Sequence, residues 1–201
     1  MKNFHHISIW LTVCFIVFAK PEKCTYNEFP ESHYSRKVIQ AEIVCLNVPR
    51  DLLITTIYFV EKPYPQDVII RESIIPTVSN YTSLLNMQFV RKLTMRNLGI
   101  EHIMPEAFRN MKILEELDLS YNKLSIVTKS TFFGLVNLRI LNLAANNISN
   151  VLEDAFEHLT KLDILDFSQN PLNDLNNVHL DKRVSVKFAS NVLNHAFSLL
   201  K

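Results

Sequence analysis

Residues 114–137 read LEELDLSYNKLSIVTKSTFFGLVN, and residues 138–161 read LRILNLAANNISNVLEDAFEHLTK. When the two stretches are aligned, the same residue or a close relative recurs at eight positions with a 24-residue period. The recurring pairs are Leu114 and Leu138, Leu117 and Leu141, Leu119 and Leu143, Asn122 and Asn146, Leu124 and Ile148, Val127 and Val151, Phe132 and Phe156, and Leu135 and Leu159. Such a period indicates similar structural units that stack and share one core.

The repeated frame is L-x-x-L-x-L-x-x-N-x-L followed by an aliphatic residue, a phenylalanine and a leucine, which is typical of leucine-rich repeats. Upstream the frame continues with Leu98 in the asparagine position, and before that with Ser73. Downstream one copy is shortened to about 21 residues and the last copy is partial. We therefore expect about six repeats, at about residues 65–89, 90–113, 114–137, 138–161, 162–182 and 183–201.

The alternating leucines predict one short strand in each repeat, and the strands of successive repeats should lie in parallel on the concave side. The recurring asparagine lies where the strand ends, so its amide can satisfy backbone groups in the bend. We expect these side chains to form a structural ladder, made of Asn122, Asn146 and Asn170. The predicted fold is an α/β solenoid, a leucine-rich-repeat horseshoe with a parallel concave sheet.

The N-terminus has the pattern of a secretory signal peptide. Lys2 precedes an uncharged apolar run of 13 residues from Ile7 to Ala19. This run is too short to cross a bilayer core of ~30 Å as a helix. We interpret residues 1–19 as a cleaved signal, which predicts a secreted protein with no membrane span in the mature chain. An uncleaved N-terminal anchor is the alternative.

Residues 20–64 do not follow the repeat frame, and we interpret them as an N-terminal cap over the first coil of the solenoid. This segment holds Cys24 and Cys45, which we expect to form a disulfide in an oxidising compartment. The bond would contribute on the order of 3 kcal/mol by the chain-entropy estimate. Asn80 and Asn147 each begin an N-glycosylation sequon, which fits the same compartment.

Composition and motifs argue against several functional classes. The 21 basic and 20 acidic residues nearly balance, which disfavours binding to nucleic acid through bulk charge. Only two glycines are present, so glycine-rich phosphate loops are not expected. The histidines form no metal-binding pair, and no serine lies in a G-x-S-x-G context. We expect no enzyme activity, no metal and no cofactor.

The concave face is the usual binding surface of such a solenoid, and its residues follow from the alternation in each strand. Ser120 is expected on this face as well. The candidate protein-binding residues are Arg91, Lys92, Arg96, Glu116, Asp118, Tyr121, Arg139 and Ile140. The alternative is a solvated face that neutralises itself, in which Lys92 and Arg96 pair with Glu116 and Asp118 on the next strand.

The order of these features resembles the secreted leucine-rich-repeat immune proteins of mosquitoes and related insects. The resemblance rests on the signal peptide, the cysteine-bearing start, the 24-residue repeats and a late shortened repeat that runs into KFASNVLNHAF. In that family, later cysteines and a coiled coil join two chains, which hold complement-like thioester proteins. This sequence lacks those cysteines and heptads, so the resemblance does not extend to the covalent heterodimer.

The resemblance implies a protein partner, either a complement-like protein or a second leucine-rich-repeat chain. Our main hypothesis is therefore a secreted leucine-rich-repeat module that binds protein in insect innate immunity. The first alternative is the ectodomain, or a truncated decoy, of an adhesion or receptor-type leucine-rich-repeat protein. A structural matrix or venom component is a further alternative, and it would have no specific partner.

Overall fold

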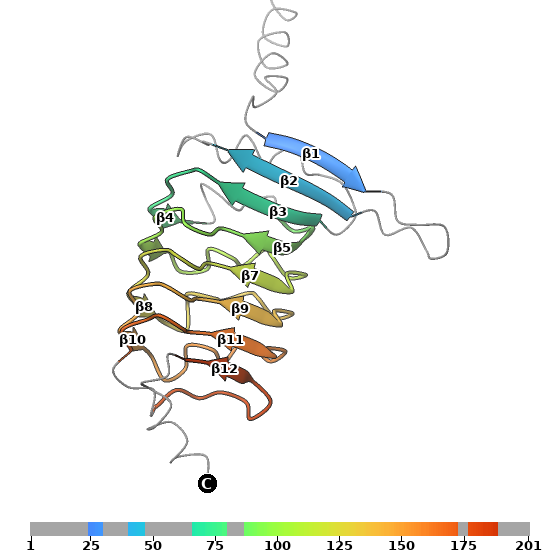
Figure 1. Cartoon of the computed structure of the whole chain (residues 1–201). Helices are drawn as coiled ribbons and strands as arrows, with labels where there is room; N and C mark the ends of the chain where they lie inside the picture. The colour runs from blue at the N-terminus through green and yellow to red at the C-terminus, as the bar shows by residue number, and fades with distance from the viewer. Residues whose placement is uncertain (1–23, 30–39, 47–65, 80–86, 173–176, 189–201) are drawn as a thin grey trace, which may run out of the picture.

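The computed structural model describes residues 24–29, 40–46, 66–79, 87–172 and 177–188. Eight strands form one sheet in the order β1-β2-β3-β5-β7-β9-β11-β12 (Figure 1). Their bounds are β1 Cys24–Phe29, β2 Gln40–Leu46, β3 Gln66–Arg71, β5 Val90–Thr94, β7 Glu116–Asp118, β9 Ile140–Asn142, β11 Ile164–Asp166 and β12 Ser185–Lys187. β1 runs antiparallel to β2, and every later neighbour is parallel. The sheet therefore grows by one strand for each turn of the chain.

The strand register reproduces the sequence period. Leu141 lies between Leu117 and Leu165, which occupy the equivalent position in the preceding and the following repeat. Leu165 pairs with Val186, so the turn between β11 and β12 has a shorter, 21-residue offset. The six parallel strands from β3 to β12 are joined by five turns of the solenoid. The predicted parallel-sheet solenoid is confirmed.

The convex side carries short strands that pair from turn to turn. β4 Thr77–Val78 lies parallel to β6 His102–Ile103, and β8 Ile126–Val127 lies parallel to β10 Asn150–Val151. Turns connect these strands to the main sheet (Figure 1). The α/β solenoid expected from the sequence thus closes its convex side with extended segments and turns, and no α-helix occurs in the residues that the structure describes.

One hydrophobic core runs through the described turns. The leucines at the centre of β7, β9 and β11 are buried beneath the sheet. Phe132 lies between Phe108 and Phe156, with ring centroids 6.4 and 6.2 Å away. Phe167 and Phe188 extend this row of rings toward the last turn. Because each turn buries its apolar side chains against its neighbours, stability depends on stacking.

The bend after each strand uses a left-handed backbone conformation. Five residues take it at equivalent positions, each one residue before the asparagine position: Glu72 (φ 51°), Asn97 (56°), Tyr121 (58°), Ala145 (53°) and Gln169 (57°). Apart from Asn97, these residue types adopt this region at a cost, so at the other four positions the stacking of the turns and not local preference favours the bend.

Several sequence predictions fall on residues outside the described ranges. These are the signal peptide, Asn80, and most of the residues of the predicted cap and of the last repeat. Within the cap segment, β1 and β2 extend the sheet, and Cys24 lies directly opposite Cys45 in their antiparallel register.

No helix in the described ranges has the length and apolar character needed to cross a membrane.

Candidate binding surface

The outer face of the parallel strands carries most of the predicted binding residues. In β7, β9 and β11 the central leucine is buried and the two flanking side chains are half-buried. Glu116, Asp118 and Ile140 therefore lie on the outer face, and Lys92 occupies the matching position in β5. Ser120 departs from the prediction, because its side chain is buried where the chain turns inward and the residue is only 1% exposed.

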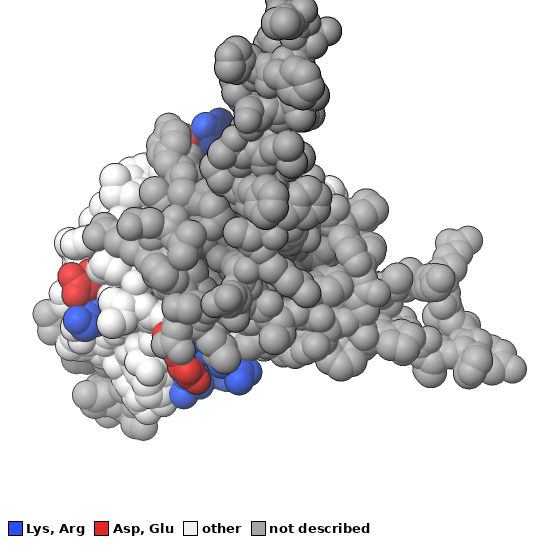
Figure 2. Space-filling model, turned by 90° about the horizontal axis from the view of Figure 1, so that it is seen from above, with Lys and Arg blue, Asp and Glu red and all other residues white. Residues whose placement is uncertain are grey.

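A column of alternating charge runs along one edge of this face. Arg91 Nη2 lies 3.3 Å from Asp67 Oδ1, and Arg91 Nη1 lies 3.9 Å from Glu115 Oε2. One strand farther on, Arg139 Nη2 lies 2.7 Å from Asp163 Oδ2. The hydrogen bond that Arg139 donates to Asp163 is the main reason why the pKa of Arg139 is raised. Basic and acidic side chains visible in Figure 2 likewise adjoin one another.

The middle of the face changes from charged to apolar along the solenoid. Lys92 Nζ lies 2.7 Å from Glu116 Oε1 on the next strand. Ile140 occupies the following position, and Ile164 lies beside it on β11. These two isoleucines are half-buried on an outer face where their neighbours are polar. They give the centre of the face an uncharged spot suited to an apolar contact.

Arg96 takes a different partner from the one expected. Thr94 is the residue aligned with Asp118, so Arg96 lies beyond the strand, where the chain has begun to turn. Its Cζ lies 4.1 Å from the centroid of the Tyr121 ring. A guanidinium over an aromatic face gains about 0.5–1 kcal/mol at an exposed site. Two of the predicted binding residues, Arg96 and Tyr121, are therefore in direct contact with each other.

Asp118 has a structural contact that the sequence analysis missed. Its Oδ1 accepts a hydrogen bond of 2.8 Å from the backbone N–H of Ser120. Asn142 and Asp166 accept the same bond from residues 144 and 168. Such Asx turns hold the chain where each strand ends. The signal was visible, because Asp or Asn recurs at this position in three successive repeats.

The asparagines of the frame are buried and bonded across turns. The Asn122 amide donates to Met95 O at 2.8 Å and to Leu119 O at 2.9 Å, and its Oδ1 accepts from Ile100 N at 3.1 Å. Asn146 and Asn170 make the equivalent bonds one and two turns later. Each asparagine therefore satisfies backbone groups of its own turn and of the preceding turn.

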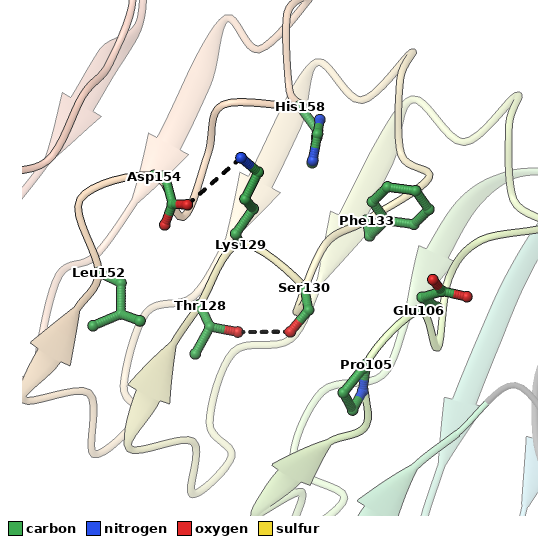
Figure 3. Close-up of a pocket in the computed structure, with 9 residues that line it drawn as sticks. All are labelled: Pro105, Glu106, Thr128, Lys129, Ser130, Phe133, Leu152, Asp154 and His158. Carbon is green, nitrogen blue, oxygen red and sulfur yellow. Dashed lines mark hydrogen bonds and ion pairs between the residues drawn. The ribbon is translucent and has the colours of Figure 1, made fainter.

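An open hollow of about 450 Å³ lies on the convex side (Figure 3). It is lined by Pro105, Glu106, Thr128, Lys129, Ser130, Phe133, Leu152, Asp154 and His158. Lys129 Nζ lies 2.5 Å from Glu157 Oε2 and 3.6 Å from Asp154 Oδ2. The bond to Glu157 is the main cause that raises the pKa of Lys129 and lowers that of Glu157. The amine is thus held by carboxylates and is poorly placed to serve as a base or nucleophile.

The remaining candidate residues are placed as follows. Asn147 is exposed, as a glycosylated asparagine must be, and its backbone N–H donates to Leu124 O at 2.9 Å. Within the described residues, no group of three or more His, Cys, Asp or Glu side chains is placed to hold a metal ion.

Comparisons with known proteins identify the repeats. A family model described as "Leucine rich repeat" matches residues 90–148 and 137–188. A chain in the crystal structure of a TLR13–ssRNA13 complex is similar, with 25% identity and a TM-score of 0.56. The match covers 68% of this chain and only 19% of that one.

Another match is a chain in an octameric complex of latrophilin 3, Unc5D and FLRT2, with 11% identity and a TM-score of 0.39. It covers 72% of this chain and 66% of that chain, and a score this low supports no inference. No curated protein matched the sequence.

Proposed function

We propose that this leucine-rich-repeat protein is a secreted binding module whose concave face docks a protein partner. The observation that carries the proposal is the outer face of β5 to β11. That face presents polar and apolar groups from successive turns, and Tyr121, in the bend after β7, is 46% exposed. Extended concave surfaces of this kind are what solenoid proteins use for binding.

The groups on this face differ in what they offer a partner. Lys92 and Arg139 already have carboxylate partners, and exposed ion pairs of this type contribute little to stability. Ile140 and Tyr121 are better anchors, because burying an apolar or aromatic side chain dominates binding energy at interfaces. We assign the isoleucine pair on β9 and β11 to the centre of the interface and the ion pairs to its rim.

Secretion is part of the proposal and is supported by the cap. Strands β1 and β2 set Cys24 opposite Cys45. Directly paired residues of antiparallel strands have Cα atoms ~4.5–5.5 Å apart, within the range that a disulfide requires. The exposed sequon at Asn147 also fits an extracellular protein.

An innate-immune role is the finer part of the proposal. It is supported by the resemblance to secreted insect proteins, whose late shortened repeat has a counterpart in the 21-residue turn before β12. The partner would then be a complement-like protein or a second leucine-rich-repeat chain. RNA, which accompanies TLR13 in its complex, fits this chain less well. Glu116, Asp118 and Asp166 place negative charge along the concave face.

Affinity capture from the extracellular fluid of the organism that makes the protein tests the proposal. The bait is the secreted chain, compared with an Ile140→Asp variant and with the matched Ile126→Asp variant. Ile126 lies on β8 on the convex side and is 53% exposed. We expect one specific protein on the wild type and on the Ile126→Asp bait, and its loss from the Ile140→Asp bait. If the Ile140→Asp bait captures the same protein as the wild type, or if no bait captures a specific protein, the concave-face function is contradicted.

A further inference from the structure

The basic residues of the concave face fall into two groups. Four of them have a carboxylate of a neighbouring strand within reach: Arg91, Lys92, Arg139 and Lys187. Arg71 and Arg96 have none among the residues that the structure describes. Both side chains are exposed. Because the other four cations of this face are paired, these two arginines are the ones left available to an external anion.

The two arginines occupy equivalent backbone positions in successive turns, each one residue before a residue with a positive φ, Glu72 or Asn97. β3 and β5 are parallel, and their paired register ends with Ile69 opposite Thr94, two residues before Arg71 and Arg96. Neighbouring strands are ~4.8 Å apart. Val68 and Ile70 are buried, so Arg71 projects from the opposite, outer face of β3. Arg71, the last residue of β3, and Arg96, two residues past the end of β5, are thus exposed at the same end of neighbouring strands.

Tyr121 holds one of these arginines in place. The guanidinium of Arg96 lies over the ring at 4.1 Å, while the ring itself remains 46% exposed. Stacking fixes the guanidinium plane and uses none of its N–H donors. An anion that contacted both guanidinium groups would be held by two positive charges. This arrangement is organised for binding before a ligand arrives.

We propose that Arg71, Arg96 and Tyr121 form a carboxylate-binding site that takes an Asp or Glu side chain of the protein partner. The proposal rests on the concave-face function and specifies its chemistry. Guanidinium groups match a carboxylate with paired, charge-assisted hydrogen bonds. Tyr121 contributes an aromatic wall against the aliphatic part of the acidic residue.

The surrounding charges favour a protein carboxylate over a polyanion. Asp118 lies on β7, directly after β5, and has no cationic partner among the described residues, whereas Glu116 and Asp166 are paired with Lys92 and Lys187. A nucleic acid or sulfated polysaccharide that followed the face would meet these carboxylates, whereas one acidic side chain would not.

Selection of displayed random peptides on the purified secreted chain tests the site. We expect the wild type to enrich peptides with Asp or Glu at one recurring position. The double variant Arg71→Glu/Arg96→Glu should instead favour Lys or Arg there. It should also bind a peptide that was selected on the wild type about tenfold or more weakly. Each lost charge-assisted bond is a substantial part of the affinity for such a peptide.

The matched control is Lys112→Glu/Lys182→Glu, which changes net charge equally at two exposed lysines in the connections that precede strands. We expect this control to bind as the wild type does. If charge reversal prevents secretion, Arg71→Gln/Arg96→Gln should show the same loss of acidic peptides. Enrichment without an acidic preference, or with one that both double variants keep, overturns the proposal.

Two further outcomes also overturn it. One is tight binding of heparin or single-stranded RNA at physiological salt that depends on both arginines. The other is self-association that depends on them. The concave-face function is judged separately. If the selected peptides need Ile140 for binding but carry no recurring Asp or Glu, the concave-face function stands and only the carboxylate site is contradicted. Peptides that bind without Ile140 contradict the function itself.

Discussion

The buried side chain of Ser120 shows how the repeat determines the surroundings of a single residue. Ser120 is buried, and its Oγ has no hydrogen-bond partner in the described structure. The next turn has Ala144 at the same position. A hydroxyl buried without a partner lowers stability, because it has lost its bonds to water. The local environment therefore fits alanine better than serine.

We predict that Ser120→Ala raises the free energy of unfolding by about 1 kcal/mol. The methyl group of the new alanine would remain where the serine Cβ lies, and no bond would be lost. Chemical denaturation of the two proteins measures the difference. The reverse change in the next turn, Ala144→Ser, serves as the control and should not stabilise. A clear loss of stability in Ser120→Ala would show that the hydroxyl has a partner.

Asn146 provides the opposite case. It donates to Leu119 O and Leu143 O at 3.0 Å each and accepts from Leu124 N at 3.1 Å. We predict that Asn146→Ala lowers the free energy of unfolding by about 1–3 kcal/mol, because these buried backbone groups lose their partner. Asn147→Ala, at the exposed neighbouring residue, should change stability little. Equal stability of both variants, measured by denaturation, would argue against the ladder.

At this scale the sequence predicted some features and missed others. The position of the asparagines followed from the period, because one residue type recurs where a bend must bury backbone groups. The burial of Ser120 was missed, since strict alternation was continued past the end of β7 into the bend. The contact between Arg96 and Tyr121 was missed for the same reason.

The connections between strands depend on close backbone approach at one glycine. A Cβ built on Gly134 would lie 2.5 Å from Arg109 Cα in the preceding turn, a severe clash with backbone. Gly99 also has a positive φ, but nothing lies within 4 Å of its Cβ position. Substituting alanine at Gly99 therefore tests the cost of the backbone conformation alone. The same change at Gly134 adds the cost of a clash between neighbouring turns.

We predict that Gly134→Ala destabilises the protein more than Gly99→Ala. The Gly99 variant should lose about 1 kcal/mol from backbone strain alone, whereas the Gly134 variant must also separate two turns. Thermal unfolding of both variants measures the difference. If Gly99→Ala were the more damaging change, the close contact with Arg109 would not matter for stability.

The first two strands carry a prediction of their own. Because Cys24 and Cys45 are directly opposite in β1 and β2, we expect a disulfide between them in the secreted protein. Mass spectrometry of the unreduced protein should detect the cross-linked peptide pair, and reduction should lower the melting temperature. Two free thiols in protein recovered from the medium would contradict both the bond and the oxidising compartment.

Across the whole molecule, the 24-residue period predicted more of the fold than any single motif did. Repeated leucines at 24-residue spacing predicted the parallel sheet, its register and the shorter turn before β12. The charge column from Asp67 to Asp163 was harder to foresee, since it needs side chains at the start of successive strands to lie in line. The partner cannot be deduced from the frame, because the frame describes the core and the partner contacts the outer face.

The concave face as the docking surface is the central claim, and site-specific photo-cross-linking tests it most directly. A benzoylphenylalanine replaces Tyr121 on the concave side or Phe133 on the convex side, two exposed aromatic residues. Each protein is mixed with the captured partner and irradiated. We expect a covalent complex from position 121 and none from position 133. Cross-linking from position 133 alone would contradict the account.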